Sequence, residues 1–375
     1  MKMKTWKNII NTFVKVETKF DSLRRLLSLR LKLNDPIQIT PYLGYGTTKH
    51  LYLKGRVLEN ENIEPPSTDD TILDNIINIY KRLESDEVVG ARLKARFRGL
   101  EEETVTDNEG FFEVHFDMPS PLEDEAFWYD VELELIEPSL SKEEKISCKG
   151  WVMVPSHTAQ FGVISDIDDT VIKTEATNLL AMAKNTLLHN AHTRLPFDGV
   201  PAFYKALKHG THATAFNPIF YVSSSPWNLY DLFIDMFEFH HIPLGPLLLQ
   251  DYGLDENTMF IKEHHIHKLE QIKKVLQIYP KLPFILIGDS GQKDPEIYEE
   301  VVRTYPNQIK AIYIRDVSSE RRDKEVERIA ERVKKLDVDM LLVWNTFVAA
   351  EHAIKHRLIP AEKLAHIGAN LVDKV

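Results

Sequence analysis

The sequence predicts an α/β protein in which a Rossmann-like parallel sheet follows a small β-sandwich. After Ser156, short apolar runs alternate with helical stretches, which is typical of a parallel sheet covered by helices. Between Pro36 and Ser156, period-2 and apolar-rich runs separated by turn residues indicate β-strands. The length of 375 residues is enough for two domains with a sizeable core. We therefore expect an accessory β-domain at 35–157 and an α/β domain at 158–375.

The composition excludes several classes of protein. With 43% hydrophobic and 27% charged residues, the chain is neither collagen-like nor largely disordered. A net charge of −11 repels polyanions, so we expect no nucleic-acid partner. Cys148 has no second cysteine to pair with, and the N-terminus lacks the apolar core of a secretory signal, which together indicate the cytoplasm. No run reaches the roughly 18 apolar residues of a spanning helix, so any membrane contact must be peripheral.

The first segment, 1–34, is positively charged, whereas the whole chain carries a net negative charge. It carries nine basic and two acidic residues, and its apolar residues from Trp6 to Leu27 recur at helical spacing. A basic amphipathic helix of this kind can lie on anionic lipid. The alternative is that the apolar face packs on the protein itself while the charges are solvated.

The region before Ser156 is expected to contain strands with one helical interruption. A helix is expected to begin near Ser67, and the acidic stretch Glu101-Glu102-Glu103 reads as a solvated loop or strand edge. Gly110 is expected to supply the positive φ of a hairpin turn within 104–114. The strands are expected at Ile37–Tyr45, His50–Val57, Ala91–Phe97, Phe111–Phe116, Tyr129–Ile136 and Ile146–Val154.

In the α/β region, polar clusters follow three of the expected strands. Asp166-Ile167-Asp168-Asp169-Thr170 follows the first, Ser223-Ser224-Ser225 the second, and Gly288-Asp289-Ser290 the fourth. Ligands bind at the carboxyl ends of such strands, so we expect these clusters to form one site. The strands are expected at Phe161–Ser165, Ile219–Val222, Met259–Ile261, Phe284–Ile287 and Ala311–Ile314.

Four carboxylates are expected to converge there, from Asp166, Asp168, Asp289 and Asp294. Asp166 and Asp168 are two residues apart, so an extended backbone directs both carboxylates to one side. Their repulsion favours a hard cation, and Mg²⁺, which accepts carboxylate together with phosphate oxygens, suits the arrangement. The alternative for the first pair alone is a solvated acidic loop.

Two further residue types complete the expected site. Ser223 offers a hydroxyl and a backbone N–H for a phosphate oxygen, with Ser224 as its rival. Lys268 offers an ammonium that compensates an anionic intermediate. Its rivals are Lys262, Lys273 and Lys274.

In this order, the residues resemble the four motifs of the haloacid-dehalogenase-like phosphatase superfamily. The motif positions are Asp166-Asp168-Thr170, Ser223, Lys268 and Asp289-Asp294. The surrounding residues of Thr158–Val317 are similar to the catalytic domain of the actin-patch-associated phosphatidate phosphatases of fungi and their bacterial relatives. That resemblance implies Mg²⁺-dependent hydrolysis of phosphatidate to diacylglycerol and phosphate.

The resemblance also implies a role for each residue. Asp166 is the nucleophile that forms an aspartyl-phosphate, and Asp168 is the acid/base. The metal residues are Asp166, Asp168 through its carbonyl, and Asp289, while Asp294 orients the metal's waters or Lys268. The residues expected to contact the substrate phosphate are Thr170, Ser223, Ser224 and Arg315, the last with a structural ion pair as its alternative.

The spacing of the motifs leaves little room for a cap domain. Residues 171–222 lie between the first two motifs, and a helix at Asn178–His189 and the stretch Phe197–Leu207 use most of them. An open site suits a bulky or membrane-bound lipid phosphate, and the basic segment 1–34 suits the inner face of an anionic membrane. The alternatives are a phosphatase of a soluble or protein-bound phosphomonoester, and an inactive membrane- or protein-binding scaffold.

Overall fold

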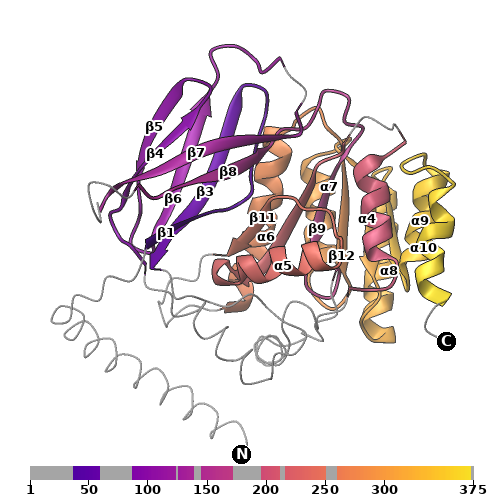
Figure 1. Cartoon of the computed structure of the whole chain (residues 1–375). Coiled ribbons are helices and arrows are strands. Elements are labelled where there is room, and N and C mark those ends of the chain that lie inside the picture. The colour runs from indigo at the N-terminus through magenta and orange to yellow at the C-terminus, as the bar shows by residue number, and fades with distance from the viewer. Residues whose placement is uncertain are drawn as a thin grey trace, which may run out of the picture.

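The computed structural model describes residues 37–59, 87–123, 126–138, 145–171, 196–211, 216–250 and 260–372, and the findings below concern these residues. They contain two β-sheets that lie side by side, the second covered by helices (Figure 1). Three predictions lie outside the described residues: the basic segment 1–34, the helix expected near Ser67 and the helix expected at Asn178–His189.

The first sheet contains eight strands among the described residues. Its hydrogen-bonded order is β1-β3-β2-β8-β7-β4-β5, and β6 pairs with β3. Side chains from both halves of this order enclose one apolar core, so the strands form two facing layers. The strands are β1 (Ile37–Pro41), β2 (Gly44–Gly46), β3 (His50–Glu59), β4 (Arg92–Phe97), β5 (Leu100–Val105), β6 (Phe111–Asp117), β7 (Trp128–Glu137) and β8 (Ser147–Met153).

One detail of this sheet differs from the prediction, and the acidic stretch lies at the edge of the sheet, which is one of its two predicted alternatives. Gly110 has the expected positive φ of 74°, but the turn does not close a hairpin, because β5 pairs with β4 whereas β6 pairs with β3. The turn instead leads the chain from one layer to the other. The acidic stretch lies in β5, where Glu101 and Glu103 form ion pairs with basic residues of β4. These cross-strand pairs, rather than an apolar pattern, characterise the strand.

The second sheet contains six described strands, and every neighbouring pair is parallel. Its order is β11-β10-β9-β12-β13-β14. The strand expected at Met259–Ile261 is wrong, because Phe260 begins a helix and the strand after β10 is β11. The strands are β9 (Gly162–Asp166), β10 (Ile219–Pro226), β11 (Leu247–Gln250), β12 (Phe284–Asp289), β13 (Ile309–Arg315) and β14 (Asp339–Val343).

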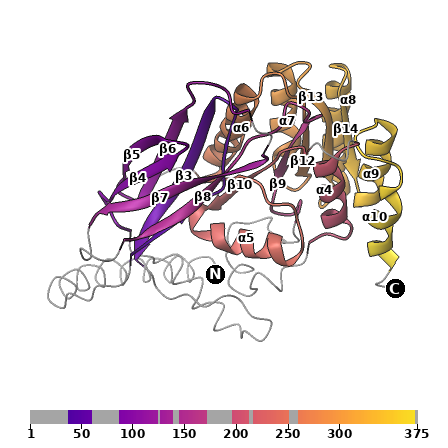
Figure 2. The same ribbon diagram turned by 45° about the horizontal axis from the view of Figure 1, so that its top comes forward.

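Helices cover both faces of the second sheet (Figure 2). Val163 and Ile285 pack with α4, α5, α9 and α10, whereas the alternate residues Ile164 and Leu286 pack with α6, α7 and α8. None of the described helices combines the length and hydropathy needed to span a bilayer. The helices are α4 (Val200–His209), η1 (Trp227–Leu229), α5 (Tyr230–Phe239), α6 (Phe260–Ile278), α7 (Asp294–Thr304), α8 (Glu320–Lys334), α9 (Thr346–Lys355) and α10 (Lys363–Val372).

The two sheets share apolar contacts. Tyr42, from the loop after β1, stacks on Trp227 with ring centroids 4.5 Å apart. Tyr45 of β2 meets Phe220 of β10 edge to face at 5.6 Å. The Tyr279 hydroxyl donates to the carbonyl of Gly46 at 2.8 Å. The first sheet therefore packs directly against β10, η1 and the end of α6.

Candidate active site

The candidate site lies at the carboxyl ends of β9, β10 and β12. The chain runs from β9 through β10 to β11 on one side and then returns to β12 on the other side of β9. This reversal of strand order is where open parallel sheets bind their ligands. Asp166 is the last residue of β9 and Asp289 the last of β12, so the reversal brings two carboxylates together.

Lys268 of α6 joins the aspartates that follow β9 and β12. Its ammonium donates to Asp166 Oδ1 at 2.8 Å and to Asp294 Oδ1 at 2.5 Å, and all three side chains are buried. Lys273 instead forms ion pairs with Glu270 and Glu300. The side chain of Lys262 lies outside the described residues, and Lys274 lines a groove discussed below. Of the rivals with described side chains, none takes the place of Lys268.

Asp294 is held close to β12 by a glycine. Its Oδ2 accepts a hydrogen bond from the backbone N–H of Asp289 at 3.1 Å. A Cβ at Gly288 would lie 2.4 Å from the same oxygen, so a larger residue there would displace the carboxylate. The carboxylate therefore reaches Lys268 only because residue 288 has no side chain.

The carboxylates have the geometry and donor atoms of a site for a hard cation. Asp166, Asp289 and Asp294 each offer one oxygen, and the three oxygens lie within 4.8 Å of one another. Asp166 Oδ2 and Asp289 Oδ2 are buried and have no hydrogen-bond partner among the described residues. A buried charged oxygen without a partner is costly, and an all-oxygen donor set suits Mg²⁺. The residues present therefore fit this ion.

The ionisation of the cluster reflects the same excess of negative charge. Burial raises the pKa of Asp166 well above its usual range, and Asp294 and Asp289 raise it further against the opposing effect of Lys268. Burial, followed by Asp294, raises the pKa of Asp289 to about 8. Burial would lower the pKa of Lys268, but Asp166, Asp294 and Asp289 outweigh it and raise that pKa. One ammonium does not balance these carboxylates, so a further positive charge would stabilise them.

Asp168 has different partners from Asp166. Its Oδ2 accepts hydrogen bonds from the hydroxyls of Ser223 at 2.9 Å and Ser225 at 3.2 Å. Ser224 is half-buried and is not one of these donors. The sequence interpretation placed Ser225 in a cluster expected at the site but gave it no role, although alternation along β10 places residues 223 and 225 on one face and 224 on the other. Ser223 and Asp168 therefore lie together, and Ser225 joins them.

Gln292 is a second residue to which the sequence interpretation gave no role. Its side chain donates to the carbonyl of Asp168 at 3.3 Å, and its backbone N–H donates to Asp289 Oδ1 at 2.8 Å. It therefore connects the loop after β12 to the loop after β9. The sequence signal was its place between Asp289 and Asp294.

Arg315 contacts the loop after β9 through Thr170. Its Nε donates to the Thr170 carbonyl at 3.2 Å, its Nη2 donates to the Thr346 hydroxyl at 3.0 Å, and its guanidinium lies 4.1 Å from the ring centroid of Phe197. Burial lowers the pKa of Arg315 to about 10. These contacts give it a positioning role, and its contact with substrate stays a prediction. The buried Thr170 Oγ1 has no hydrogen-bond partner among the described residues.

A groove of about 730 Å³ lies between the two sheets, and some of its lining residues are close in sequence to residues of the candidate site. Trp227, which directly follows β10, and His267, which precedes Lys268, both line the groove. None of the four aspartates lines it. Its other lining residues mix aromatic and leucine side chains with charged ones. The groove is therefore distinct from the buried carboxylate cluster.

The part of the chain that is similar to known proteins contains most of the second sheet. Residues 161–316 match the family model of the phosphatidate phosphatase APP1 catalytic domain. The chain is 37% identical over 163 residues to phosphatidate phosphatase APP1 of Saccharomyces cerevisiae, which covers 43% of this chain and 27% of the yeast protein. It is 29% identical over 161 residues to an uncharacterized protein of Schizosaccharomyces pombe, 42% of this chain and 25% of that protein.

The chain thus spans about a quarter of the length of these curated relatives. Among solved structures, β-glucuronidase of Parabacteroides merdae aligns with 82% of this chain and 39% of its own at 8% identity, with a TM-score of 0.27 that is too low to bear on the fold. The similarity to the phosphatidate phosphatase catalytic domain covers β9 to β13 and every aspartate, serine and lysine described in the candidate active site.

Proposed function

We propose that this chain is a Mg²⁺-dependent phosphatase of the haloacid-dehalogenase-like superfamily that hydrolyses phosphatidate to diacylglycerol and phosphate. The observation that carries the proposal is the buried group of Asp166, Asp289, Asp294 and Lys268, in which one oxygen of Asp166 and one of Asp289 have no hydrogen-bond partner among the described residues. A nucleophilic carboxylate beside a cation site is what phosphoryl transfer through an aspartyl-phosphate requires.

Mg²⁺ would be held by Asp166, Asp289 and the Asp168 carbonyl, and it would neutralise charge on the phosphate oxygens. The protein's own residues account for the rest of the positioning. Lys268 fixes Asp166 and supplies a second positive charge, while Asp294 fixes Lys268. We propose that the hydroxyl of Thr170, which has no hydrogen-bond partner among the described residues, donates to a substrate oxygen, whereas the Ser223 hydroxyl donates to Asp168 Oδ2.

In the first step, an Asp166 oxygen attacks phosphorus and the bond between phosphorus and the glycerol oxygen breaks. Asp168 donates a proton to that leaving oxygen, which releases diacylglycerol. In the second step, the Asp168 carboxylate removes a proton from water, and the water oxygen attacks the phosphorus of the aspartyl-phosphate. Inorganic phosphate leaves, Asp166 regains its carboxylate and Asp168 is again protonated. The serine hydroxyls on Asp168 Oδ2 stabilise the ionised form that the second step needs.

The lipid substrate is supported by the similarity to phosphatidate phosphatase APP1 of yeast. The basic segment 1–34 adds a reason of its own, because cationic amphipathic segments bind anionic bilayers. We propose that the chain acts as a peripheral protein at such a surface. A soluble phosphomonoester and an inactive binding scaffold are the competing functions.

The test is phosphate release from phosphatidate in mixed micelles, with an aryl phosphate as a water-soluble substrate, in Mg²⁺ or EDTA. We expect faster turnover of phosphatidate and none in EDTA. Asp166→Asn is expected to lose all turnover. Asp337→Asn is the matched control, because Asp337 is exposed and has a φ of 60°, a conformation that asparagine accepts readily.

The intermediate is tested separately with Asp168→Asn and the aryl phosphate, whose leaving oxygen departs without the proton of Asp168, so that the variant is blocked only at the second step, where it lacks the base. Intact-mass measurement should find one added phosphoryl group, located in the peptide with Asp166 and removed by hydroxylamine. Turnover of the aryl phosphate alone would contradict the lipid assignment, and turnover without a trapped phosphoenzyme would contradict the mechanism. Lipid binding with no turnover of either substrate would favour the scaffold.

A further inference from the structure

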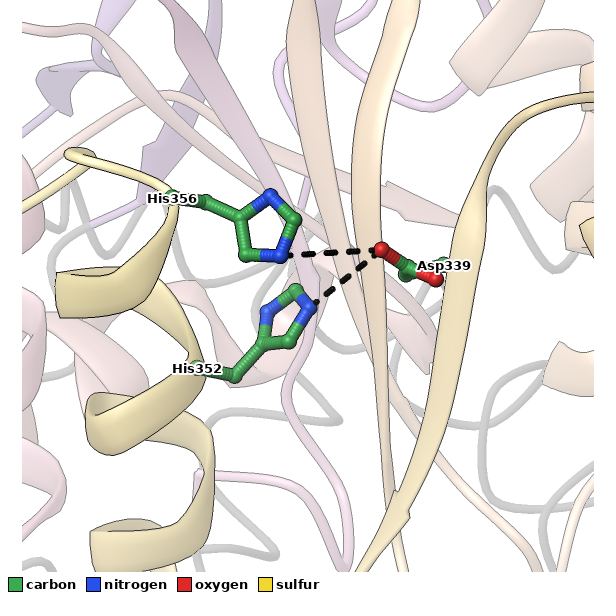
Figure 3. A group of neighbouring side chains, drawn as sticks. All are labelled: Asp339, His352 and His356. Carbon is green, nitrogen blue, oxygen red and sulfur yellow. Dashed lines mark ion pairs between the residues drawn. The ribbon is translucent and has the colours of Figure 1, made fainter.

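A second group of metal-type ligands lies away from the active site. Asp339 begins β14, and His352 and His356 lie one helical turn apart at the end of α9. Figure 3 shows both rings directed at the Asp339 carboxylate. The three side chains offer ligand atoms that lie within 4.8 Å of one another. All three residues lie outside the matched range 161–316.

The group lies near the amino ends of the parallel strands, whereas the catalytic aspartates lie at their carboxyl ends. Asp339 is in register with Ala311 near the start of β13. Asp289, in contrast, is in register with Arg315 at the end of that strand. Four residues of parallel strand separate the two levels by about 13 Å. The ligand group is therefore separate from the carboxylate cluster.

The distances suit ligands of one ion better than they suit hydrogen bonds. Asp339 Oδ2 lies 3.5 Å from His352 Nε2 and 3.7 Å from His356 Nε2. Hydrogen bonds between such atoms are about 2.7–3.2 Å long. Two ligand atoms at about 2.0–2.1 Å from a tetrahedral Zn²⁺ are separated by roughly 3.3–3.4 Å, which is closer to the observed 3.5 and 3.7 Å than a hydrogen bond is. The observed spacings thus leave room for an ion between the three atoms.

Neighbouring groups orient the ligands. Nδ1 of His352 lies 3.0 Å from the hydroxyl of Tyr313, so its other nitrogen, Nε2, is the one directed at Asp339. An outer hydrogen bond to the second ring nitrogen is a regular feature of histidine ligands to metals. Lys334 donates to Asp339 Oδ1, so Oδ2 is the oxygen that faces the rings. The ammonium of Lys334 is well exposed, so solvent weakens its repulsion of a cation.

We infer that Asp339, His352 and His356 bind a divalent transition-metal ion, with Zn²⁺ as the best match. Two imidazole nitrogens and one carboxylate oxygen suit Zn²⁺ and related ions rather than Mg²⁺, which prefers oxygen ligands alone. His356 is partly exposed, so water can supply a fourth ligand. The bound ion links the edge strand β14 to the end of α9, and α9 in turn packs against α10. Binding therefore stabilises this end of the fold.

The test is a titration of the metal-free, full-length protein with Co²⁺, in a large excess of Mg²⁺ that occupies the carboxylate cluster. We expect one equivalent of Co²⁺ to bind with the strong visible absorption of a four-coordinate site, and Zn²⁺ to displace it. Zn²⁺ should also raise the thermal midpoint of the wild-type protein. Neither measurement depends on phosphatase activity.

His352→Gln and His356→Gln should each weaken Co²⁺ binding at least tenfold and abolish the Zn²⁺-dependent rise in midpoint. Tyr313→Phe should weaken binding by about tenfold, because it removes only the outer contact. His366→Gln is the matched control, since this exposed histidine lies on α10 and should leave binding unchanged. Circular dichroism of each metal-free variant verifies folding. Absorption that is weak, or equal in the wild type and both ligand variants, overturns the proposal.

Discussion

The hydroxyl of Ser225 donates to Asp168 Oδ2 at 3.2 Å. Ser223 donates to the same oxygen at 2.9 Å, and the backbone N–H of Ser225 donates to the Ser223 hydroxyl at 2.9 Å. Ser225 therefore positions Asp168 both directly and through Ser223. Hydrogen bonds to an ionised carboxylate lower its pKa, so both serines favour the charged form of Asp168.

We predict that Ser225→Ala lowers kcat by about tenfold, since a hydrogen bond to a charged group contributes about 1.5 kcal/mol. KM should change little, because the side chain holds Asp168 rather than the substrate. Loss of a donor should also shift the pH profile of the rate to higher pH, since the ionised form of Asp168 loses a stabilising hydrogen bond.

Steady-state kinetics across pH measures both effects. Ser147→Ala, an exposed serine of β8, is the control and should match the wild type. A Ser225→Ala variant with an unshifted profile would show that the hydroxyl does not act on Asp168.

The sequence could predict the aspartates because they stand at or just after the carboxyl ends of strands in a parallel sheet, whereas Lys268, inside α6, could be chosen only from the order of the motifs that the sequence resembles. It gave no role to Ser225 or Gln292, because their roles depend on which face of β10 meets Asp168 and on how the loop after β12 folds back. The ligand group of Asp339, His352 and His356 depends on how β14 lies against α9, which is a tertiary relationship.

The errors in the fold have similar causes. A short apolar run does not distinguish a strand from the start of a helix, so Met259–Ile261 was open to either interpretation. The turn at Gly110 is a local feature and has the expected positive φ. The pairing of β6 with β3 rather than β5 is set by the core that the two layers share.

The carboxylate cluster yields a prediction about stability without metal. Asp289→Asn removes one of the buried carboxylates that share Lys268, and its side-chain oxygen can still accept from the Gln292 N–H. We therefore expect the metal-free variant to be more stable than the metal-free wild type, by on the order of 2 kcal/mol at pH 8. Mg²⁺ should stabilise the wild type and leave the variant almost unaffected.

Urea unfolding in EDTA and in Mg²⁺ measures these differences. Asp337→Asn serves again as the control and should respond to Mg²⁺ as the wild type does. A metal-free Asp289→Asn protein that is less stable than the wild type would contradict the view that repulsion dominates this cluster.

The contact between the sheets gives a third prediction. Trp227 is buried and stacks on Tyr42, and Tyr230 lies beside both rings. Trp227→Ala should lower the free energy of unfolding by about 3–5 kcal/mol, since it leaves a cavity between the two sheets. Trp344 is 72% exposed, so Trp344→Ala should change stability by less than about 0.5 kcal/mol. Urea unfolding followed by circular dichroism compares them, and equal effects would mean that the sheets do not stabilise each other through this stack.

The ion pair between α7 and α8 predicts a dependence of stability on pH. Glu299 accepts from Arg332 Nε at 2.7 Å and Nη2 at 2.6 Å, and from Arg303 Nη2 at 2.8 Å. Arg332, followed by Arg303, lowers the pKa of Glu299 to about 2, against the opposing effect of burial. A lowered pKa stabilises the fold above the unfolded value of 4.5, and this contribution is lost as the pH falls toward 2.

Both arginines are about half exposed, so solvent screening reduces the contribution of the Glu299 ion pair to about 1 kcal/mol. Glu299→Gln should therefore be less stable than the wild type by that amount at pH 7, and the difference should vanish near pH 2. Glu300→Gln is the control, because Glu300 is more exposed and lies 3.7 Å from its lysine partner. Urea unfolding at pH 7, 4 and 2.5 measures the difference. A constant difference across this range would place the effect of Glu299 in packing rather than in charge, since only the charge is lost on protonation.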